Sequence, residues 1–299
     1  MNNNNSSMVR SIPLTVPSKP ATGSGRSMGA ILIDAGRLSL VDAERILQLQ
    51  RERGARFGEA GMALGLLTAD DVRYALSVQF DYPYLARESK LSRELVAAYQ
   101  PASSGVEQLR ALRSQLMLRW FDGAAERKGL AIVSAGPKDG RSYIAANLAI
   151  VFSQLGQRTL LIDADLRSPR QHQLFNLGHC AGLSDVLAGR AGPEAVLRIA
   201  ALQDLSVLPA GTLPPNPQEL LGRQEFPKLL QSLGEDFDVI IIDTPAASQC
   251  ADAHTVAVRA GAALLVARQN QSSVPQIAQL THGLREFGVT LVGSVLNDV

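Results

Sequence analysis

A glycine-containing stretch in the middle of the chain has the residue types needed to hold phosphate groups. Residues 130–149 consist of an apolar run, then a tight loop and then a helical run. In the pattern G-x-x-x-x-G-K-[ST], backbone N–H groups surround the phosphates, the lysine reaches their oxygens, and the hydroxyl binds magnesium. The window 135–142 fits this pattern except that Ala135 replaces the first glycine and Arg141 replaces the lysine. Such a degenerate match needs support from elsewhere in the chain.

Three aspartates provide that support, because each follows a run of β-branched and aliphatic residues. Asp163 and Asp165 follow residues 159–162, and Asp243 follows residues 239–242. A single aspartate there is often only a turn former. Phosphoryl transfer, however, needs magnesium, carboxylates that hold it, and a group that accepts the proton of the attacking hydroxyl. Together with Ser142, the aspartates are the candidates for these roles.

Eight of the predicted nucleotide-binding residues lie in the loop and the helical turn after it. They are Gly136, Pro137, Lys138, Asp139, Gly140, Arg141, Ser142 and Tyr143.

The elements that must position these residues alternate in type from Gly129 onward. Short apolar runs predict strands, and helical segments separate them; the runs are 131–133, 159–162, 205–208, 239–242, 263–266 and 291–295. This alternation is typical of an α/β fold, a doubly wound and mostly parallel sheet with helices on both faces. Ligands bind at the carboxyl ends of the strands in such folds, where the aspartates are expected.

The N-terminal part of the chain contains an internal repeat. Gly29 and Gly58, like Gln50 and Gln79, lie 29 residues apart. Each copy reads as a short helix ended by glycine, then a polar cap and a longer amphipathic helix. We therefore predict a small all-helical domain. The predicted divisions are a disordered leader over 1–25, the helical domain over 26–88, a linker over 89–104 and the α/β domain over 105–299.

The repeat resembles the MshEN domain of type II secretion and pilus ATPases, whose tandem motifs can bind cyclic di-GMP. The first copy departs from the motif, since Ser27 stands where its arginine belongs and Arg37 stands at an apolar position. The alternative is a helical docking module whose leucines form its core. The resemblance makes five residues of the second copy candidates for cyclic di-GMP binding: Arg56, Phe57, Gly58, Leu66 and Leu67.

Composition restricts the classes of binding partner and the cellular setting that we expect. The formal net charge is +1 in 299 residues, which argues against a nucleic-acid-binding protein. Cys180 and Cys250 are seventy residues apart and show no metal-ligand spacing, so a reducing cytoplasm is the expected setting. No apolar run reaches the roughly 18 residues of a membrane span, and we expect membrane association only through a partner.

From residue 107 onward the ordered motifs resemble the bacterial tyrosine kinase family, and in particular the EpsG-type chain-length-determinant kinases of exopolysaccharide operons. The motifs are the glycine loop, Leu-Leu-Ile-Asp-Ala-Asp-Leu-Arg over 160–167, residues 182–189, residues 208–221 and residues 237–245. The resemblance implies ATP and Mg²⁺ as cofactors, with Ser142 and Asp163 organising the metal. It implies that Asp165 assists the catalytic base and that Asp243 is the acidic residue of the second nucleotide-binding motif, also at the metal.

The same resemblance implies further roles. A Glu-x-x-Arg-x-x-Arg helix that mediates oligomerisation in the family matches Glu107, Arg110 and Arg113. Related ATPases contact adenine with an asparagine after the last strand, a position matched by Asn297, although a terminal turn explains that residue equally well.

The predicted function is therefore that of a cytoplasmic, ATP-dependent protein-tyrosine kinase-like regulator of exopolysaccharide chain length. The resemblance implies a homo-oligomer held at the inner membrane by a transmembrane polysaccharide copolymerase. Two departures favour an alternative, a nucleotide-dependent switch without phosphate transfer to tyrosine. Arg141 differs in shape from lysine, and the last tyrosine of the chain is Tyr143, which predicts no autophosphorylation on a C-terminal tail.

Overall fold

The structure, a computed structural model, describes residues 26–79, 85, 89–124 and 126–298. Backbone contacts divide the chain into two compact units, Met1–Tyr82 and Pro83–Val299. The leader predicted over 1–25 lies outside the described residues. Among the helices that the structure does describe, none combines the length and the apolar character needed to cross a bilayer.

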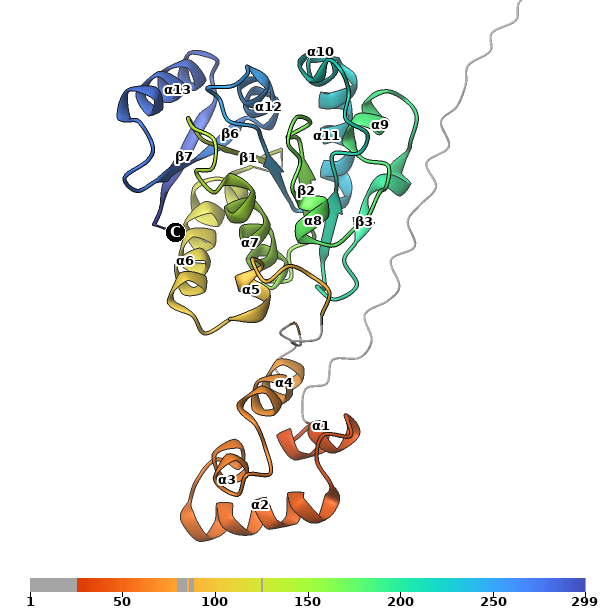
Figure 1. Cartoon of the computed structure of the whole chain (residues 1–299), viewed down its shortest axis with the longest axis vertical. Helices are drawn as coiled ribbons and strands as arrows, with labels where there is room; N and C mark the ends of the chain where they lie inside the picture. The colour runs from red at the N-terminus through yellow and green to blue at the C-terminus, as the bar shows by residue number, and fades with distance from the viewer. Residues whose placement is uncertain (1–25, 80–84, 86–88, 125, 299) are drawn as a thin grey trace, which may run out of the picture. The chain divides into compact units, whose positions relative to one another are not determined.

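The N-terminal unit consists of helices, as the repeat predicts (Figure 1). Its helices are α1 (Met28–Asp34), α2 (Leu40–Arg53), α3 (Phe57–Ala63) and α4 (Ala69–Gln79). The two repeat glycines permit close packing of the copies. A Cβ at Gly29 would lie 3.1 Å from the Phe57 ring, and one at Gly58 would lie 3.0 Å from Val72 and 3.5 Å from Met28. Glycine at these positions lets each short helix pack against the other copy.

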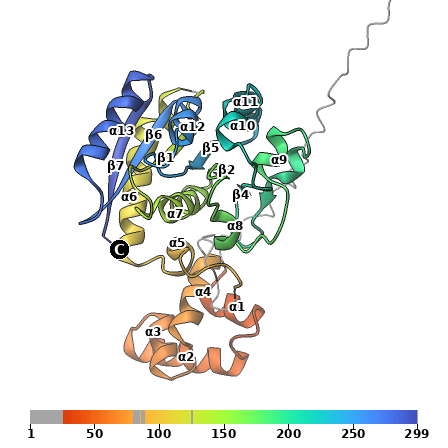
Figure 2. The ribbon, with the colours of Figure 1, turned by 45° about the horizontal axis from the view of Figure 1, so that its top comes forward.

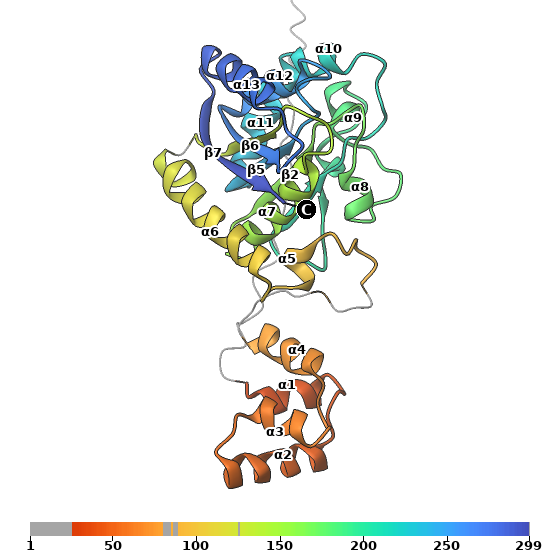
Figure 3. The same cartoon turned by 60° about the vertical axis from the view of Figure 1, so that its left-hand side comes forward.

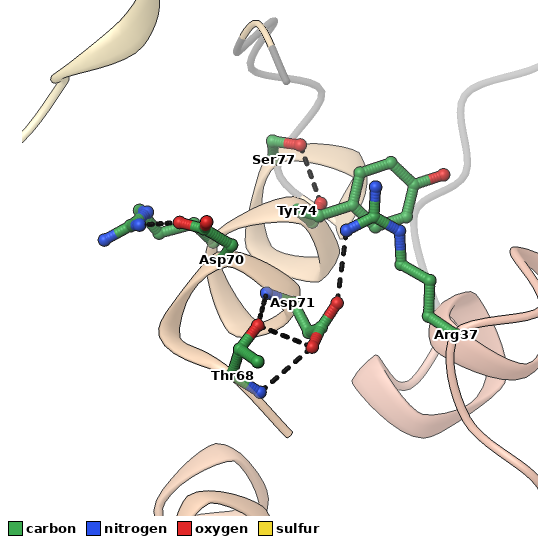
Figure 4. Close-up of polar contacts among 7 residues, drawn as sticks. Arg37, Thr68, Asp70, Asp71, Tyr74 and Ser77 are labelled. Atoms are coloured by element: carbon green, nitrogen blue, oxygen red, sulfur yellow. Dashed lines mark hydrogen bonds and ion pairs between the residues drawn. The ribbon is translucent and has the colours of Figure 1, made fainter. Parts of the chain in front are cut away.

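Polar side chains fix where the long helices of this unit begin. The Ser39 hydroxyl accepts a hydrogen bond from Asp42 N (3.1 Å), and the Thr68 hydroxyl accepts one from Asp71 N (3.2 Å). Asp71 also binds Arg37, at 3.1 Å, and the Arg37 guanidinium lies 4.3 Å from the centroid of the Tyr74 ring (Figure 4). Arg37, which departs from the repeat pattern, thus links the two copies.

The second unit is built on a seven-stranded sheet with the order β3-β4-β2-β5-β1-β6-β7. Its strands are β1 (Gly129–Val133), β2 (Thr159–Asp163), β3 (Leu197–Arg198), β4 (Leu205–Leu208), β5 (Val239–Asp243), β6 (Ala262–Arg268) and β7 (Thr290–Asn297). All neighbouring strands are parallel except β3 and β4. The predicted doubly wound, mostly parallel sheet is confirmed. The two-residue β3 was not predicted, because it is too short to show a periodic pattern.

Helices cover both faces of the sheet, which Figures 2 and 3 show from two directions. Alternate residues of one strand enter opposite cores: Leu130 and Ile132 join the cluster that includes α6 and α7, whereas Ala131 and Val133 join the cluster under α10–α13. The helices are α5 (Val96–Tyr99), α6 (Ser104–Arg119), η1 (Phe121–Gly123), α7 (Arg141–Ser153), α8 (Gln171–Leu174), α9 (Leu183–Leu187), η2 (Pro193–Ala195), α10 (Pro217–Gly222), α11 (Glu225–Asp236), α12 (Asp252–Ala260) and α13 (Val274–Glu286).

The segment predicted as a linker, 89–104, instead packs into the second unit. Leu95, Ala97 and Ala98 are fully buried in the cluster under α7. The buried Asn147 side chain of α7 fixes the backbone of this segment. It accepts a hydrogen bond from Ala97 N (2.9 Å) and donates one to the Glu94 carbonyl (2.9 Å). The sequence suggested a linker because turn-forming residues outnumber the few apolar residues of this segment that are buried. The second unit thus begins near residue 83 rather than at 105.

Candidate functional site

The glycine loop connects β1 to the N-terminus of α7. Gly140 immediately precedes the helix with φ +100°, a conformation that side-chain-bearing residues rarely adopt. A Cβ at Gly140 would also clash with the Asn297 amide. Within the part of the chain that the structure describes, no side chain caps this helix, so its first N–H groups and its dipole face the loop. This arrangement suits an anionic ligand such as phosphate.

Arg141 occupies the lysine position of the pattern, and its side chain points into the loop rather than out of it. It is only 8% exposed. Its Nε donates to the Thr244 carbonyl (2.8 Å), and one terminal nitrogen donates to the Gly136 carbonyl (2.8 Å) and to the Ser134 hydroxyl. The planar fork of arginine serves three acceptors at once, which a lysine ammonium does with different geometry. Arg141 therefore supports the loop from within.

Two further side chains hold the loop in shape. Asp139, predicted as a nucleotide-binding residue, is 2% exposed; it accepts from Gly136 N (3.0 Å) and from the Ser272 hydroxyl (2.8 Å). Asn297, at the end of β7, donates its side-chain amide to the Asp139 carbonyl (3.1 Å). By contrast, Pro137 and Lys138 are exposed at the loop tip. Ser272 and Asn297, which are distant in sequence, thus stabilise the shape of the loop through Asp139.

Asp163 and Asp243 end the neighbouring strands β2 and β5 and are direct register partners. Both are fully buried. Burial and the charge of Asp243 raise the pKa of Asp163 well above its usual value, against the lowering effect of hydrogen bonds from the backbone N–H groups of Gln171 and Arg170. Burial raises the pKa of Asp243 to about 6, although the adjacent Ser142 hydroxyl, the Gln171 hydrogen bond and the nearby Arg141 charge lower it. Two buried carboxylates side by side favour a cation between or beside them.

Asp165 follows the same strand and lies at the rim of the site. It is 6% exposed, and its Oδ1 accepts hydrogen bonds from Arg167 N (3.2 Å) and Ser168 N (2.9 Å). Its own backbone N–H donates to Asp163 Oδ1 (3.2 Å). Asp165 therefore shapes the turn after β2 as well as adding a carboxylate to the site.

Gln171 is a site residue that the sequence did not reveal. It is fully buried, and its side-chain Nε2 donates to Asp243 Oδ2 (2.8 Å) and to the Ser142 carbonyl (3.2 Å). Its backbone N–H donates to Asp163 Oδ2 (2.9 Å). A neutral glutamine eight residues after Asp163, in a polar stretch, carries no motif that could have identified it.

The site residues fit the magnesium nucleotide that the motifs predict. Asp243 Oδ1 is buried, and no donor among the described residues reaches it. The described residues also contain no group of three or more His, Cys, Asp or Glu side chains placed to enclose a metal. A site with two carboxylates and a serine hydroxyl is what Mg²⁺ uses when phosphate oxygens and water supply its remaining ligands. Ser142, Asp163 and Asp243 are therefore the residues that would hold Mg²⁺, beside the phosphate-binding loop.

Tyr143, the last tyrosine of the chain, is half-buried against the core cluster of α7. Burial and the nearby Glu94 carboxylate raise the pKa of its phenol. Glu94 in turn forms an ion pair with Arg170, at 2.7 Å. The segment 89–99 thus contacts the turn that leads from Asp163 to Gln171.

The three residues predicted to mediate oligomerisation share α6 but differ in their contacts. Glu107 and Arg110 pair with each other at 3.0 Å. Arg113 donates to the Val151 carbonyl of α7 at 2.8 Å. Arg113 thus contributes to packing within the unit, which the helical spacing alone did not indicate.

The five residues predicted to bind cyclic di-GMP differ in their burial. Phe57, Gly58, Leu66 and Leu67 contribute to the packing of the helical unit, whereas Arg56 is exposed. A shallow cavity of about 470 Å³ in the same unit has other walls, formed by Leu47, Gln50, Arg51, Gly54 and Ala55.

Comparisons with known proteins agree with this geometry. The family model described as "Cellulose biosynthesis protein BcsQ" matches residues 130–292. Tyrosine-protein kinase YwqD of Bacillus subtilis is 35% identical over 211 residues, which cover 71% of this chain and 88% of that protein. Tyrosine-protein kinase etk of Escherichia coli K12 is 35% identical over 204 residues, but the match spans only 28% of its length.

Comparison with solved structures also finds similarity to a bacterial tyrosine kinase domain. The kinase domain of Escherichia coli tyrosine kinase ETK superposes with a TM-score of 0.67 at 33% sequence identity, covering 72% of this chain and 83% of that one. The septum site-determining protein MinD from Pyrococcus horikoshii, solved with Mg-ADP, has a TM-score of 0.50 at 24% identity and shares the fold.

Proposed function

Since the chain belongs to the bacterial tyrosine-protein kinase family, we propose that its second unit binds ATP with Mg²⁺ and transfers the terminal phosphoryl group to tyrosine. The observation that carries this proposal is the pair of fully buried carboxylates, Asp163 and Asp243, at the ends of adjacent strands beside the glycine loop. Nothing in an ordinary core requires two neighbouring buried carboxylates, and without a cation their mutual repulsion is unfavourable.

Each residue has a role that its position supports. The first N–H groups of α7 bind phosphate oxygens, and Ser142, Asp163 and Asp243 hold the metal. Bound Mg²⁺ would neutralise charge that develops on the transferred phosphoryl group. Asp165, which follows the same strand as Asp163, assists the group that takes up the proton of the substrate hydroxyl. Asn297 contacts the adenine base, a proposal supported by its hydrogen bond to the loop at the Asp139 carbonyl.

One observation favours the second candidate function, a nucleotide-dependent switch without phosphate transfer. Arg141 directs its guanidinium to Thr244, Gly136 and Ser134 inside the loop. A cation held there stabilises the loop but does not reach a terminal phosphate unless these bonds break. Nucleotide binding is expected in both cases, and phosphate transfer separates them.

The experiment incubates the full chain with labelled ATP, Mg²⁺ and a tyrosine-containing copolymer. The variant Asp163→Asn removes the metal-binding carboxylate, and Asp122→Asn, at an exposed aspartate of η1, is the matched control. We expect transfer to tyrosine to fall about 100- to 1,000-fold in Asp163→Asn and to be unchanged in Asp122→Asn. If the unmodified chain binds ATP but labels tyrosine no faster than Asp163→Asn does, the switch function replaces the kinase function.

We propose further that this activity regulates exopolysaccharide chain length from the cytoplasmic face of the inner membrane, through a transmembrane copolymerase partner. The support is the family, whose matching model is named for cellulose biosynthesis. Comparison of polymer length in cells carrying Asp163→Asn or Asp122→Asn tests this role. Equal lengths in both strains would remove it.

Self-association through α6 is a proposal supported by the ion pair between the partly buried Arg110 and the exposed Glu107. Light scattering of Arg110→Ala should show a smaller assembly than the unmodified chain, and an unchanged mass would contradict the proposal.

Cyclic di-GMP binding by the helical unit is a separate proposal, which rests on the exposed Arg56, and docking of a partner protein is the alternative. Calorimetry with cyclic di-GMP decides between them, since heat that Arg56→Ala abolishes supports the sensor.

A further inference from the structure

Gln171 is a fully buried, uncharged residue beside the two carboxylates of the site. It begins the short helix α8, which follows the turn after β2. Its side chain contacts Asp243 and the backbone of Ser142, and its main chain contacts Asp163. It therefore touches all three residues proposed to hold the metal, and it reaches them from one position.

The hydrogen bonds determine which way the amide faces. Nε2 has two acceptors, Asp243 Oδ2 at 2.8 Å and the Ser142 carbonyl at 3.2 Å. The reverse orientation would place the amide oxygen against a carboxylate and a carbonyl, where all three atoms are acceptors. Gln171 must therefore act as a donor to Asp243, and this bond occupies Oδ2.

The other carboxylate oxygen of Asp243 has a different environment. Oδ1 is buried without a hydrogen-bond donor among the described residues. An unpaired buried acceptor is costly, so a group that interacts with Oδ1 stabilises the folded chain. With Oδ2 held by Gln171, the carboxylate cannot rotate to exchange its two oxygens without breaking a hydrogen bond to a charged group.

We propose that Gln171 is a positioning residue, which holds Asp243 so that Oδ1 is presented to the magnesium of a bound nucleotide. This inference rests on the proposed magnesium–nucleotide site and deepens it. Gln171 acts through Asp243, because the Nε2 group that holds Oδ2 is a donor and cannot bind a cation. Outer partners of this kind commonly change metal affinity about 10- to 100-fold when they are removed.

The main-chain bond makes the test specific. Every substitution at this position retains the backbone N–H that donates to Asp163 Oδ2 (2.9 Å). A change in the side chain therefore removes the contacts to Asp243 and Ser142 and leaves that to Asp163. If Gln171 only fills space, methionine of similar length should replace it. If it must donate a hydrogen bond, methionine fails and histidine, which has a ring N–H, retains part of the effect.

The experiment measures ADP binding to the full chain by calorimetry, once with Mg²⁺ and once with EDTA, and compares the two affinities. The variants are Gln171→Met, Gln171→Glu and Gln171→His, and the matched control is Gln173→Met at an exposed position of the same helix. We expect Gln171→Met and Gln171→Glu to keep their affinity in EDTA within about twofold and to lose about 10- to 100-fold of the gain from Mg²⁺. Mn²⁺ binding in the presence of ADP, followed by electron paramagnetic resonance, should weaken in parallel.

Two results would overturn the inference, and they differ. If the unmodified chain gains affinity from Mg²⁺ and the Met and Glu variants gain equally, Gln171 has no positioning role although the proposed site stands. If the unmodified chain binds no nucleotide under either condition, the proposed function fails and this inference fails with it. Should Gln171→Met not fold, as judged by its thermal melt in EDTA, the contrast between Gln171→Glu and Gln171→His gives the same decision.

Discussion

The two units of this chain place their charges in opposite ways. In the described part of the helical unit, ion pairs such as that of Arg37 with Asp71 lie at the surface around a small apolar core. In the α/β unit, Asp163 and Asp243 are fully buried next to each other, and Arg141 is almost fully buried beside them. Surface pairs contribute little to stability but also cost little, whereas buried charges are unfavourable unless they are compensated. The contrast indicates that the second unit gives up stability for a ligand site.

The largest expected effect compares two glycines with positive φ. Gly140 has φ +100° and no room for a Cβ beside Asn297, whereas Gly65, in the helical unit, has φ +67° and open space. Gly140→Ala should cost on the order of 3 kcal/mol through strain and displacement of the loop, and so weaken nucleotide binding about 100-fold. Gly65→Ala should cost about 1 kcal/mol and leave binding unchanged. Calorimetry and thermal melts measure both; equal effects on binding would contradict the comparison.

The second prediction compares two arginines. Arg141→Ala leaves the Thr244 carbonyl, which follows β5, without this donor, and it leaves the Gly136 carbonyl with the Ser134 hydroxyl as its donor. The loss should lower the free energy of unfolding by about 2 kcal/mol. Arg37→Ala removes a surface ion pair and a contact with the Tyr74 ring, and should cost about 1 kcal/mol or less. Urea unfolding in EDTA gives both values. A larger loss for Arg37→Ala would show that its pairing matters more than its exposure suggests.

The third prediction compares two carboxylates whose pKa values shift in opposite directions. Burial raises the pKa of Asp243 to about 6, so its ionised form destabilises the metal-free fold at neutral pH. Asp243→Asn should therefore stabilise the chain in EDTA at pH 7.5, by on the order of 1–2 kcal/mol. As the pH falls from about 6 towards the usual pKa of 3.8, Asp243 takes up a proton in the folded state, and the advantage of the variant should shrink over this interval and vanish below it.

Asp71 should behave in the opposite way. Burial raises its pKa, but hydrogen bonds from Thr68 and Arg37 outweigh this and hold the pKa below its usual value of 3.8. Its contribution to stability is then present above pH 3.8 and is lost as the pH falls through the lower folded value. Asp71→Asn should destabilise the chain at pH 7.5, by less than about 1 kcal/mol. Thermal melts across pH test both signs, and two substitutions of the same sign would refute the contrast.

The smallest expected effect concerns an ion pair at the surface of the second unit. Glu94 pairs with Arg170 with both side chains nearly half exposed, so Glu94→Ala should cost less than about 1 kcal/mol. It should also lower the pKa of Tyr143, because the Glu94 carboxylate is one of the two causes that raise it; burial remains. Ultraviolet titration of the phenol measures the shift. An unchanged titration would mean that burial alone sets this pKa.

Local patterns in the sequence were sufficient for the framework of the second unit. Each of the six predicted strands is present, because β-branched runs with turn signals between them specify buried strands without reference to distant residues. The positions of Asp163 and Asp243 follow from the same rule, since parallel strands bring their carboxyl ends to one edge of the sheet. The helix pairs of the N-terminal unit likewise follow from the repeat.

Only the tertiary structure determined which distant side chains contact the strand ends and the loop. Gln171 reaches Asp243, 72 residues away, and Ala97 reaches Asn147, 50 residues away. Neither contact leaves a periodic or spaced signal, because it depends on how separate elements pack. The inward turn of Arg141 is of the same kind, since Thr244 supplies its acceptor from the end of another strand. Sequence periodicity thus specified the strands and their ends, whereas packing decided which side chains hold the site in place.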